Sequence, residues 1–303
     1  MARVRFIASV LLLLASYNLA WADAAYKPVG TPEEAKVYLF GIHPQLNPEE
    51  LYAAYNPIMH YLESKIPGVR FKMEASKDYP SYEAKLTAGL FDFSLPNPYQ
   101  TLLSLKHGYH VIAKNTPDSD FRGVLVARLD KLNKELSLAG LKGKTLCFPS
   151  ATAVAATMLP LMYLYDHGIK AGKDVQIEYV GSQYSSILNA YTGDADACGT
   201  STRFWRIWSR DNPDKAKQMR VIFTTQSLPH NGIVARNDVP PQLAGQVAHV
   251  LAGMDKDPTV DQRQFKIDQA HFELANDATY QPMEEFLKRY DQTIGLPSSM
   301  KQN

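Results

Sequence analysis

Short apolar segments alternate with helix-like segments along most of this chain, and the alternation starts twice. In the first run the apolar segments lie at 37–42, 69–73 and 90–94, and the helix-like segments begin near 48, 82 and 100. In the second run, which starts at Gly143, the apolar segments lie at 145–148, 175–180 and 195–198, and the helices at 154–165, 184–191 and 202–208. Strands that alternate with helices at this interval form parallel βαβ units. The sequence therefore predicts an α/β fold with two lobes, each a mostly parallel sheet flanked by helices, and a cleft between them.

Two strand-like segments are placed where the chain would pass between the lobes. The segment at 123–129 would lead out of the first lobe, and the segment at 233–236 would carry the chain back. We therefore expect lobe 1 to comprise residues 25–126 and 228–303, and lobe 2 to comprise residues 127–227. The remaining C-terminal sequence predicts helices at 241–251, 260–272 and 283–290.

The first 24 residues are typical of a secretory signal peptide. Arg3 and Arg5 precede an apolar run at 6–15, and small residues then allow cleavage after Ala22 or Ala24. The apolar run is too short to span a bilayer, and no second such run follows it. We expect an exported, periplasmic protein without membrane insertion.

Charge excludes two classes of partner. Cleavage after Ala24 would remove two arginines and one aspartate from 32 basic and 31 acidic residues, so that thirty of each remain. A neutral chain without a block of lysines and arginines has no electrostatic footprint for nucleic acid or for an anionic membrane surface. We expect neither partner, and we expect a monomer.

The stretch from Lys142 to Gly168 predicts a strand, a turn of small residues and a helix. Ser150 and Thr152 are both able to cap this helix, whose first amides have no partner within it. Free amides at the positive end of a helix dipole bind anions. An ordinary capped helix remains the alternative interpretation, because serine and threonine are preferred caps in any case.

The loops that follow the predicted strands contain mostly neutral polar residues. In open α/β sheets ligands bind beyond the carboxyl ends of the strands, so these loops would line the cleft. They are rich in Ser, Thr, Asn, Gln and Tyr and nearly free of Asp, Glu and Lys. This composition favours binding through neutral hydrogen bonds, and it offers no constellation of nucleophile, base and acid. We expect a binding protein without a cofactor, and not an enzyme.

Five segments together resemble a known family, the phosphate, phosphite and phosphonate substrate-binding proteins of ABC importers, which have the type II periplasmic-binding-protein fold. The resemblance covers nearly the whole chain after residue 24 and rests on the order and spacing of these segments: Asp78-Tyr79, Leu90 to Gln100, Leu138 to Ala153, Gly181 to Thr200 and Leu228 to Arg236.

The resemblance implies a set of ligand-binding positions. In that family a turn of three hydroxyl residues, tyrosines, a histidine and an aspartate hold the oxyanion. The turn corresponds to Ala151, Thr152 and Ala153 here. The first-lobe aromatic positions correspond to Tyr79 and Phe121, the histidine to Gln183 and the aspartate to Asn231. The turn lacks two of the three hydroxyls, at Ala151 and Ala153, but keeps its backbone amides. The replacements at Phe121, Gln183 and Asn231 also change the hydrogen-bonding groups, so the ligand stays open among phosphate, phosphite and phosphonate-like anions.

Further candidates come from their positions in the loops. Asn97, Tyr99 and Thr200 lie in the resembling segments, and His43, Ser150 and His230 lie where a cleft could use them; a structural role is the alternative for each. His107 and His110 have a spacing seen in metal sites, but no third ligand is near, so no metal site is predicted.

The two cysteines, Cys147 and Cys198, lie near the carboxyl ends of two strands that are commonly neighbours in a βα lobe. In an oxidising compartment they are candidates for a disulfide, and reduced thiols near the pocket are the alternative.

These observations predict a periplasmic protein that captures a small oxyanion between two lobes and presents it to an ABC transporter permease. Presentation to the periplasmic domain of a sensor kinase is an alternative role. An arsenic oxyanion, an organic solute or a metal is an alternative ligand.

Overall fold

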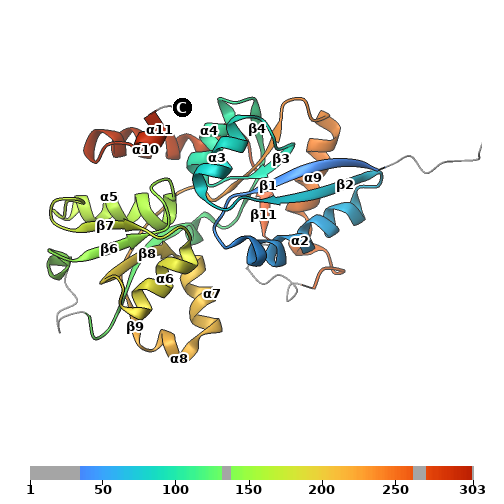
Figure 1. The fold of residues 1–303 in the computed structure, drawn as a ribbon. Helices are drawn as coiled ribbons and strands as arrows, with labels where there is room; N and C mark the ends of the chain where they lie inside the picture. Colours follow the sequence, from blue (N-terminus) through green and yellow to red (C-terminus); the bar gives the residue numbers. More distant parts are fainter. Residues whose placement is uncertain (1–34, 132–137, 262–270, 302–303) are drawn as a thin grey trace, which may run out of the picture. The chain divides into compact units, whose positions relative to one another are not determined.

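The computed structural model describes residues 35–131, 138–261 and 271–301 (Figure 1). The described residues from 36 onward form one compact unit. The predicted signal peptide, residues 1–24, lies outside the described residues. No helix among the described residues is long and apolar enough to cross a membrane.

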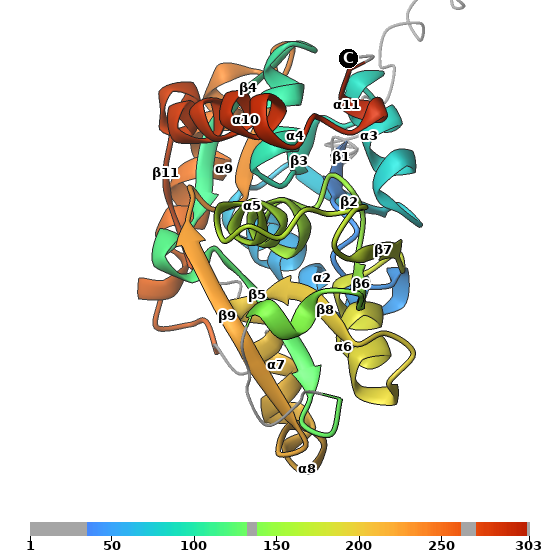
Figure 2. The same cartoon turned by 90° about the vertical axis from the view of Figure 1, so that its left-hand side faces the viewer.

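The strands form two sheets. The strands are β1 (Lys36–Ile42), β2 (Val69–Ala75), β3 (Phe93–Leu95), β4 (Tyr109–Asn115), β5 (Arg122–Arg128), β6 (Thr145–Phe148), β7 (Gln176–Tyr179), β8 (Ala197–Ser201), β9 (Met219–Ser227), β10 (Gly232–Arg236) and β11 (Phe272–Leu274). The first sheet has the order β11-β4-β10-β3-β1-β2 and the second the order β7-β6-β8-β5-β9. Figure 2 shows β9 running beside β5 in the second sheet.

Helices connect most of these strands. The helices are α2 (Pro48–Lys65), α3 (Tyr79–Thr87), α4 (Pro98–Leu105), α5 (Leu159–Asp166), α6 (Gln183–Thr192), α7 (Thr202–Asp211), α8 (Pro213–Ala216), α9 (Pro241–Ala252), α10 (Gln281–Thr293) and α11 (Ser298–Lys301). Short helical turns are η1 (Asp118–Asp120), η2 (Leu138–Leu141), η3 (Val154–Met158), η4 (Met254–Lys256) and η6 (Asp277–Tyr280).

The two-sheet α/β fold class is confirmed, and both sheets are mixed. β1 pairs in parallel with β2 and β3, and β6 pairs in parallel with β7 and β8. The strands that follow the passages between the sheets run the other way: β5 is antiparallel to β8 and β9, and β10 is antiparallel to β3 and β4.

Two elements bear on the predicted lobe division, which stays a prediction. β5 spans the predicted boundary at 126/127 and pairs with strands of the second sheet only. Helix α10, in the part assigned to lobe 1, also contacts α5, where Arg289 forms an ion pair of 2.6 Å with Asp166.

Local chemistry explains where several elements depart from the predicted bounds. Helix α3 begins at Tyr79, three residues earlier than predicted, because the Asp78 carboxylate accepts a hydrogen bond from the Ser81 amide at 2.8 Å. The predicted helix at 154–165 divides into the π-helical turn η3 and helix α5. Most of the helix predicted at 260–272 lies outside the described residues. Its last residue, Phe272, is instead in β11, where it pairs with Asn115 and is buried.

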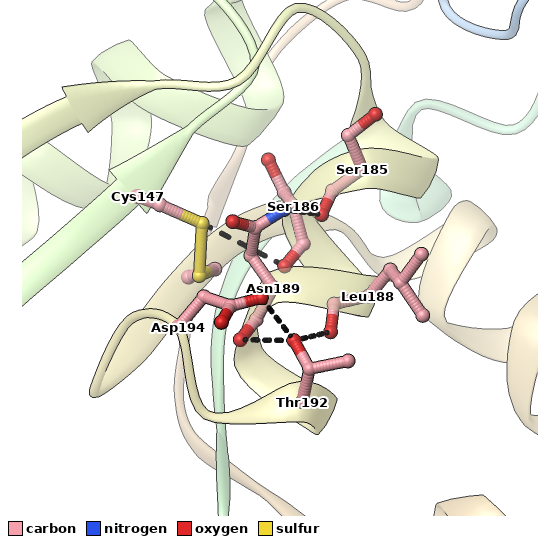
Figure 3. Close-up of a disulfide and its surroundings, with 8 residues drawn as sticks. Cys147, Ser185, Ser186, Leu188, Asn189, Thr192 and Asp194 are labelled. Atoms are coloured by element: carbon pink, nitrogen blue, oxygen red, sulfur yellow. Dashed lines mark hydrogen bonds between the residues drawn. A yellow bond between two sulfur atoms is a disulfide. The ribbon is translucent and has the colours of Figure 1, made fainter.

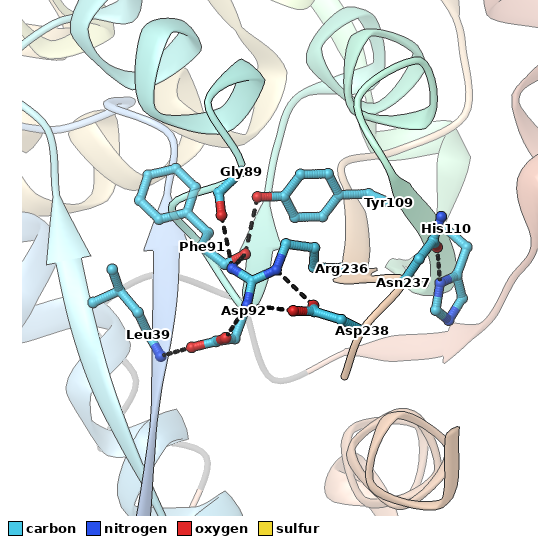
Figure 4. Close-up of polar contacts among 9 residues, drawn as sticks. All are labelled: Leu39, Gly89, Phe91, Asp92, Tyr109, His110, Arg236, Asn237 and Asp238. Carbon is cyan, nitrogen blue, oxygen red and sulfur yellow. Dashed lines mark hydrogen bonds and ion pairs between the residues drawn. The ribbon is translucent and has the colours of Figure 1, made fainter. Parts of the chain in front are cut away.

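Arg236 fixes the far end of β10 to the first sheet (Figure 4). Its guanidinium donates to the carboxylate of Asp92 at 2.8 Å and to the carbonyl oxygens of Gly89 and Phe91 at 2.7 and 3.1 Å. The other oxygen of the Asp92 carboxylate accepts from the Leu39 amide of β1 at 2.7 Å. These bonds set the register of β10, and with it the position of the loop that precedes β10.

Cys147 and Cys198 face each other on the neighbouring strands β6 and β8 and form a disulfide (Figure 3). Their Cα atoms are 4.4 Å apart, and both side chains are fully buried. Of the two alternatives, a disulfide or reduced thiols near the pocket, the structure contains the disulfide. It lies in the core of the second sheet.

Candidate ligand-binding site

Loops from both sheets line one small cavity. From the first sheet come His43 and Gln45 after β1, Tyr79 after β2, Asn97 after β3, and His230 and Asn231 before β10. From the second sheet come residues 120–121 before β5, residues 153–156 after β6, Gln183 after β7, and Ser201, Arg203 and Phe204 after β8. Residues that precede an antiparallel strand lie at the same edge as residues that follow its parallel neighbours, so all these loops gather at the carboxyl edges of the two sheets.

The cavity is small, and both polar and apolar side chains line it. Its volume is about 20 Å³, and roughly 10–15 Å³ on the same measure holds one water molecule. It therefore has no room for a bulky ligand.

The start of η3 presents main-chain donors to the cavity. Ala153 is the N-cap, without a side-chain cap, and the first backbone bonds run from the Thr157 and Met158 amides to the Ala153 carbonyl. The amides of Val154, Ala155 and Ala156 therefore have no acceptor within the helical turn, and all three residues line the cavity. Free amides at a helix start were predicted around Thr152, and in the structure they lie two to four residues further along the chain, at residues 154–156.

Two glycines allow η3 to lie directly on the second sheet. A Cβ atom at Gly199 of β8 would stand 2.1 Å from the Ala156 carbonyl oxygen, and one at Gly123 of β5 would stand 2.2 Å from the Ala155 carbonyl oxygen. Only glycine permits this approach, so β5 and β8 fix where the free amides point.

Thr152 is not the cap that the sequence predicted. Its hydroxyl donates to the Glu83 carboxylate at 2.7 Å, and its carbonyl accepts from the Asn97 side-chain amide at 2.9 Å. Gln100 donates to the same carboxylate oxygen of Glu83 at 2.9 Å. Burial raises the pKa of Glu83, although these two donors oppose the shift. Because Thr152 follows β6 while Glu83 and Asn97 follow strands of the first sheet, this buried cluster joins the two sheets.

Replacing Thr152 with valine is expected to destabilise the protein by about 2 kcal/mol, because the buried Glu83 carboxylate would lose one of its two donors. Urea unfolding would measure the change, with Ser150→Ala as the control at the neighbouring hydroxyl, where little change is expected. An unchanged free energy of unfolding in Thr152→Val would contradict a stabilising role for the bond to Glu83.

Two buried histidines face the cavity in different hydrogen-bonding states. The Nδ1 atom of His43 lies 2.9 Å from the Leu95 carbonyl oxygen, and the Nδ1 atom of His230 accepts from the Asn231 amide at 2.7 Å. Burial lowers the pKa of His43 to about 4. Burial and the positive charges of Arg203 and Lys114 lower the pKa of His230 well below its usual value.

Because both histidines are neutral in the folded protein, we expect the free energy of unfolding to fall in mild acid. The unfolded chain binds a proton at each histidine below about pH 6.5, whereas folded His43 binds one only near pH 4. The contribution of the neutral histidines to the free energy of unfolding is fully present above about pH 6.5. His43 alone should lower this free energy by roughly 2 kcal/mol between pH 7.5 and pH 5. Urea unfolding at both pH values would test this, and His43→Asn should reduce the difference. Equal free energies of unfolding at the two pH values in the unmodified protein would refute it.

Arg203 supplies a positive charge that the sequence analysis missed. It is only 4% exposed and lines the cavity from the start of α7. The cavity also contains one acidic residue, Asp120, whose carboxylate is paired with Arg206 at 3.0 Å. Its position could have been predicted, because Arg203 directly follows the loop after the predicted strand at 195–198, and such loops were expected to line the cleft.

The predicted site residues divide into two groups. Eight of them line the cavity: His43, Tyr79, Asn97, Phe121, Ala153, Gln183, His230 and Asn231. Ser150, Ala151 and Thr152 lie instead in a separate hollow with Asp78 and Tyr179, and Tyr99, on α4, lines another hollow with residues of α10. Thr200 is buried behind the cavity, where its hydroxyl donates to the Gln183 side-chain oxygen at 3.3 Å. Beside Arg203, the sequence analysis missed Gln45, Asp120, Ser201, Phe204 and residues 154–156.

Metal binding has no support in the described parts of the chain. These residues contain no group of three or more His, Cys, Asp or Glu side chains that could hold a metal ion.

Two α/β sheets with a small cavity at their carboxyl edges have the architecture of a solute-binding protein. The family described as "ABC transporter, phosphonate, periplasmic substrate-binding protein" matches residues 40–280. The chain belongs to this family, whose members are substrate-binding proteins and not enzymes.

Solved structures share the fold at low sequence identity. A binding-protein component of an ABC phosphonate transporter from Pseudomonas aeruginosa has 15% identity and a TM-score of 0.76, covering 88% of this chain and 92% of that one. PhnD1 from Prochlorococcus marinus, in complex with methylphosphonate, has 19% identity and a TM-score of 0.76, covering 85% and 99%. XAC2383 from Xanthomonas citri, bound to ATP, has 18% identity and a TM-score of 0.67, covering 86% and 99%. No curated protein matches the chain.

Proposed function

We propose that this protein captures a small oxyanion of the phosphate, phosphite or phosphonate type in the cavity. The proposal rests on three amides without an acceptor in their own helical turn, at 154–156, which line one small cavity together with the buried side chain of Arg203. Amides at a helix start and a guanidinium are both donors that oxyanions accept. The relative solved with methylphosphonate supports a ligand of this class.

The cavity size argues against a large ligand. The relative bound to ATP shows that this fold can take a nucleotide. A volume of about 20 Å³ is far too small for a nucleotide and favours a compact ligand.

The family supports a location in the periplasm and a role in import, and the first 24 residues support that location. We propose that these residues direct export and are cleaved, and that residues 25–126 and 228–303 form one lobe and residues 127–227 the other. The lobes would close on the anion, and the closed form would deliver it to the permease of an ABC importer. Presentation to a sensor kinase would use the same closed form.

Tryptophan fluorescence is a direct test of anion capture. Trp205 and Trp208 both lie on α7, the helix that carries Arg203. Titration with phosphate, phosphite, methylphosphonate, arsenate and arsenite should give a saturable change with at least one of the pentavalent or phosphorus anions. A saturable change with arsenite alone, or no response to any of these anions in fluorescence and calorimetry, would contradict the proposal.

A further inference from the structure

His43 presents a hydrogen-bond acceptor to the cavity. A backbone carbonyl oxygen only accepts, so the 2.9 Å contact with Leu95 requires the proton of His43 on Nδ1. His43 is 3% exposed, and burial keeps the ring neutral. Its Nε2 therefore carries a lone pair and no proton, and it is the ring nitrogen that remains for the cavity.

His230 presents the opposite group. Its Nδ1 accepts the Asn231 amide hydrogen, so this nitrogen carries no proton, and a neutral ring then has its proton on Nε2. This Nε2 is buried and has no hydrogen-bond partner among the described residues. The backbone of His230 is held on both sides, because its amide donates to Asp118 at 2.9 Å and its carbonyl accepts from the Tyr280 hydroxyl at 2.7 Å. The donor is thus fixed in position before a ligand arrives.

We propose that the two histidines, held in opposite tautomers, select an oxyanion that still carries a proton. His230 Nε2–H donates to a deprotonated oxygen of the ligand, while a hydroxyl of the ligand donates to His43 Nε2. The inference rests on the proposed function and names the ligand class for the same site: monoprotonated tetrahedral anions such as hydrogen phosphate, hydrogen arsenate and hydrogen phosphonates.

Other groups at the cavity support this assignment. The side-chain oxygen of Asn231 is a second buried acceptor without a partner among the described residues, so the wall contains acceptors as well as donors. A fully deprotonated anion such as sulfate would have no proton for either acceptor, and an unpaired buried acceptor opposes binding. Because Arg203 attracts any anion, we assign the discrimination between protonated and fully deprotonated anions to His43 and Asn231.

Isothermal titration calorimetry at neutral pH with phosphate and sulfate tests the proposal. Phosphate should bind at least tenfold more tightly than sulfate. In His43→Asn the new amide is still able to donate to Leu95, but nothing replaces Nε2. Phosphate affinity should then fall about 10- to 100-fold, and sulfate affinity should change less than threefold. His60→Asn, on the exposed face of α2, is the matched control and should leave both affinities unchanged.

The outcomes separate this inference from the proposed function. Equal affinities for phosphate and sulfate, or an equal loss for both in His43→Asn, would overturn the inference while leaving anion capture intact. The absence of binding by phosphate, phosphite, methylphosphonate, arsenate and sulfate in the unmodified protein would overturn both.

Nitrogen-15 spectra of the histidine rings in the unmodified protein do not depend on how the variant folds. They should show protonated Nδ1 for His43 and protonated Nε2 for His230. The same tautomer in both rings would also overturn the inference.

Discussion

Replacing Arg203 with methionine is expected to lower the affinity for the bound anion by roughly 30-fold or more. The guanidinium is buried beside the cavity, where low solvent access strengthens its attraction to an anion. Loss of one partner from a buried charge pair typically costs about 2–5 kcal/mol, which corresponds to roughly 30- to several thousand-fold in affinity. Calorimetric titration of the variant with phosphate and methylphosphonate would measure the loss.

Position 210 provides the control for this experiment. Arg210 lies on the same helix, is exposed and pairs with its neighbour Asp211 at 2.8 Å. Arg210→Met should retain the original affinity within about twofold, since surface ion pairs are worth little. An affinity in Arg203→Met within threefold of the unmodified protein would show that the anion does not depend on this charge.

Removing the disulfide is expected to cost about 4 kcal/mol of stability. The bond closes a loop between residues 51 positions apart, and the chain-entropy relation gives about 4 kcal/mol for a loop of this length. The double variant Cys147→Ala with Cys198→Ala should unfold roughly 10 °C below the unmodified protein. Because both side chains lie in the core and not at the cavity, anion affinity should change little.

Reduction of the unmodified protein is the matched comparison for that variant. Urea unfolding with and without reductant should show a similar loss of stability, while the double variant should be insensitive to reductant. A double variant as stable as the oxidised protein would contradict a stabilising disulfide.

The order of elements could be predicted from the sequence because it depends on local patterns. The strand at 145–148 was predicted with its observed bounds, and α2 starts at Pro48, where a helix-like segment was expected to begin. Glycine, proline and capping residues act over a few positions, so their effects are visible in the chain itself.

The site was predicted in part because long-range contacts decide which groups are free. The sequence suggested that the Thr152 hydroxyl was free to cap the helix, but it donates to Glu83, 69 positions earlier in the chain. No local sequence pattern predicts this bond. No local pattern predicts the start of η3 at Val154 either. The tautomers of His43 and His230 likewise depend on partners that only the fold reveals.

The position of a bound arsenate would show directly whether the cavity is the oxyanion site, because arsenic gives an anomalous signal in a crystal. A crystal soaked or grown with arsenate should give one strong anomalous arsenic peak in the cavity. Its oxygens should lie within hydrogen-bond distance of the amides of residues 154–156 and of the Arg203 guanidinium. An arsenic peak elsewhere on the protein, with the cavity holding only water, would contradict the claim that this cavity is the oxyanion site.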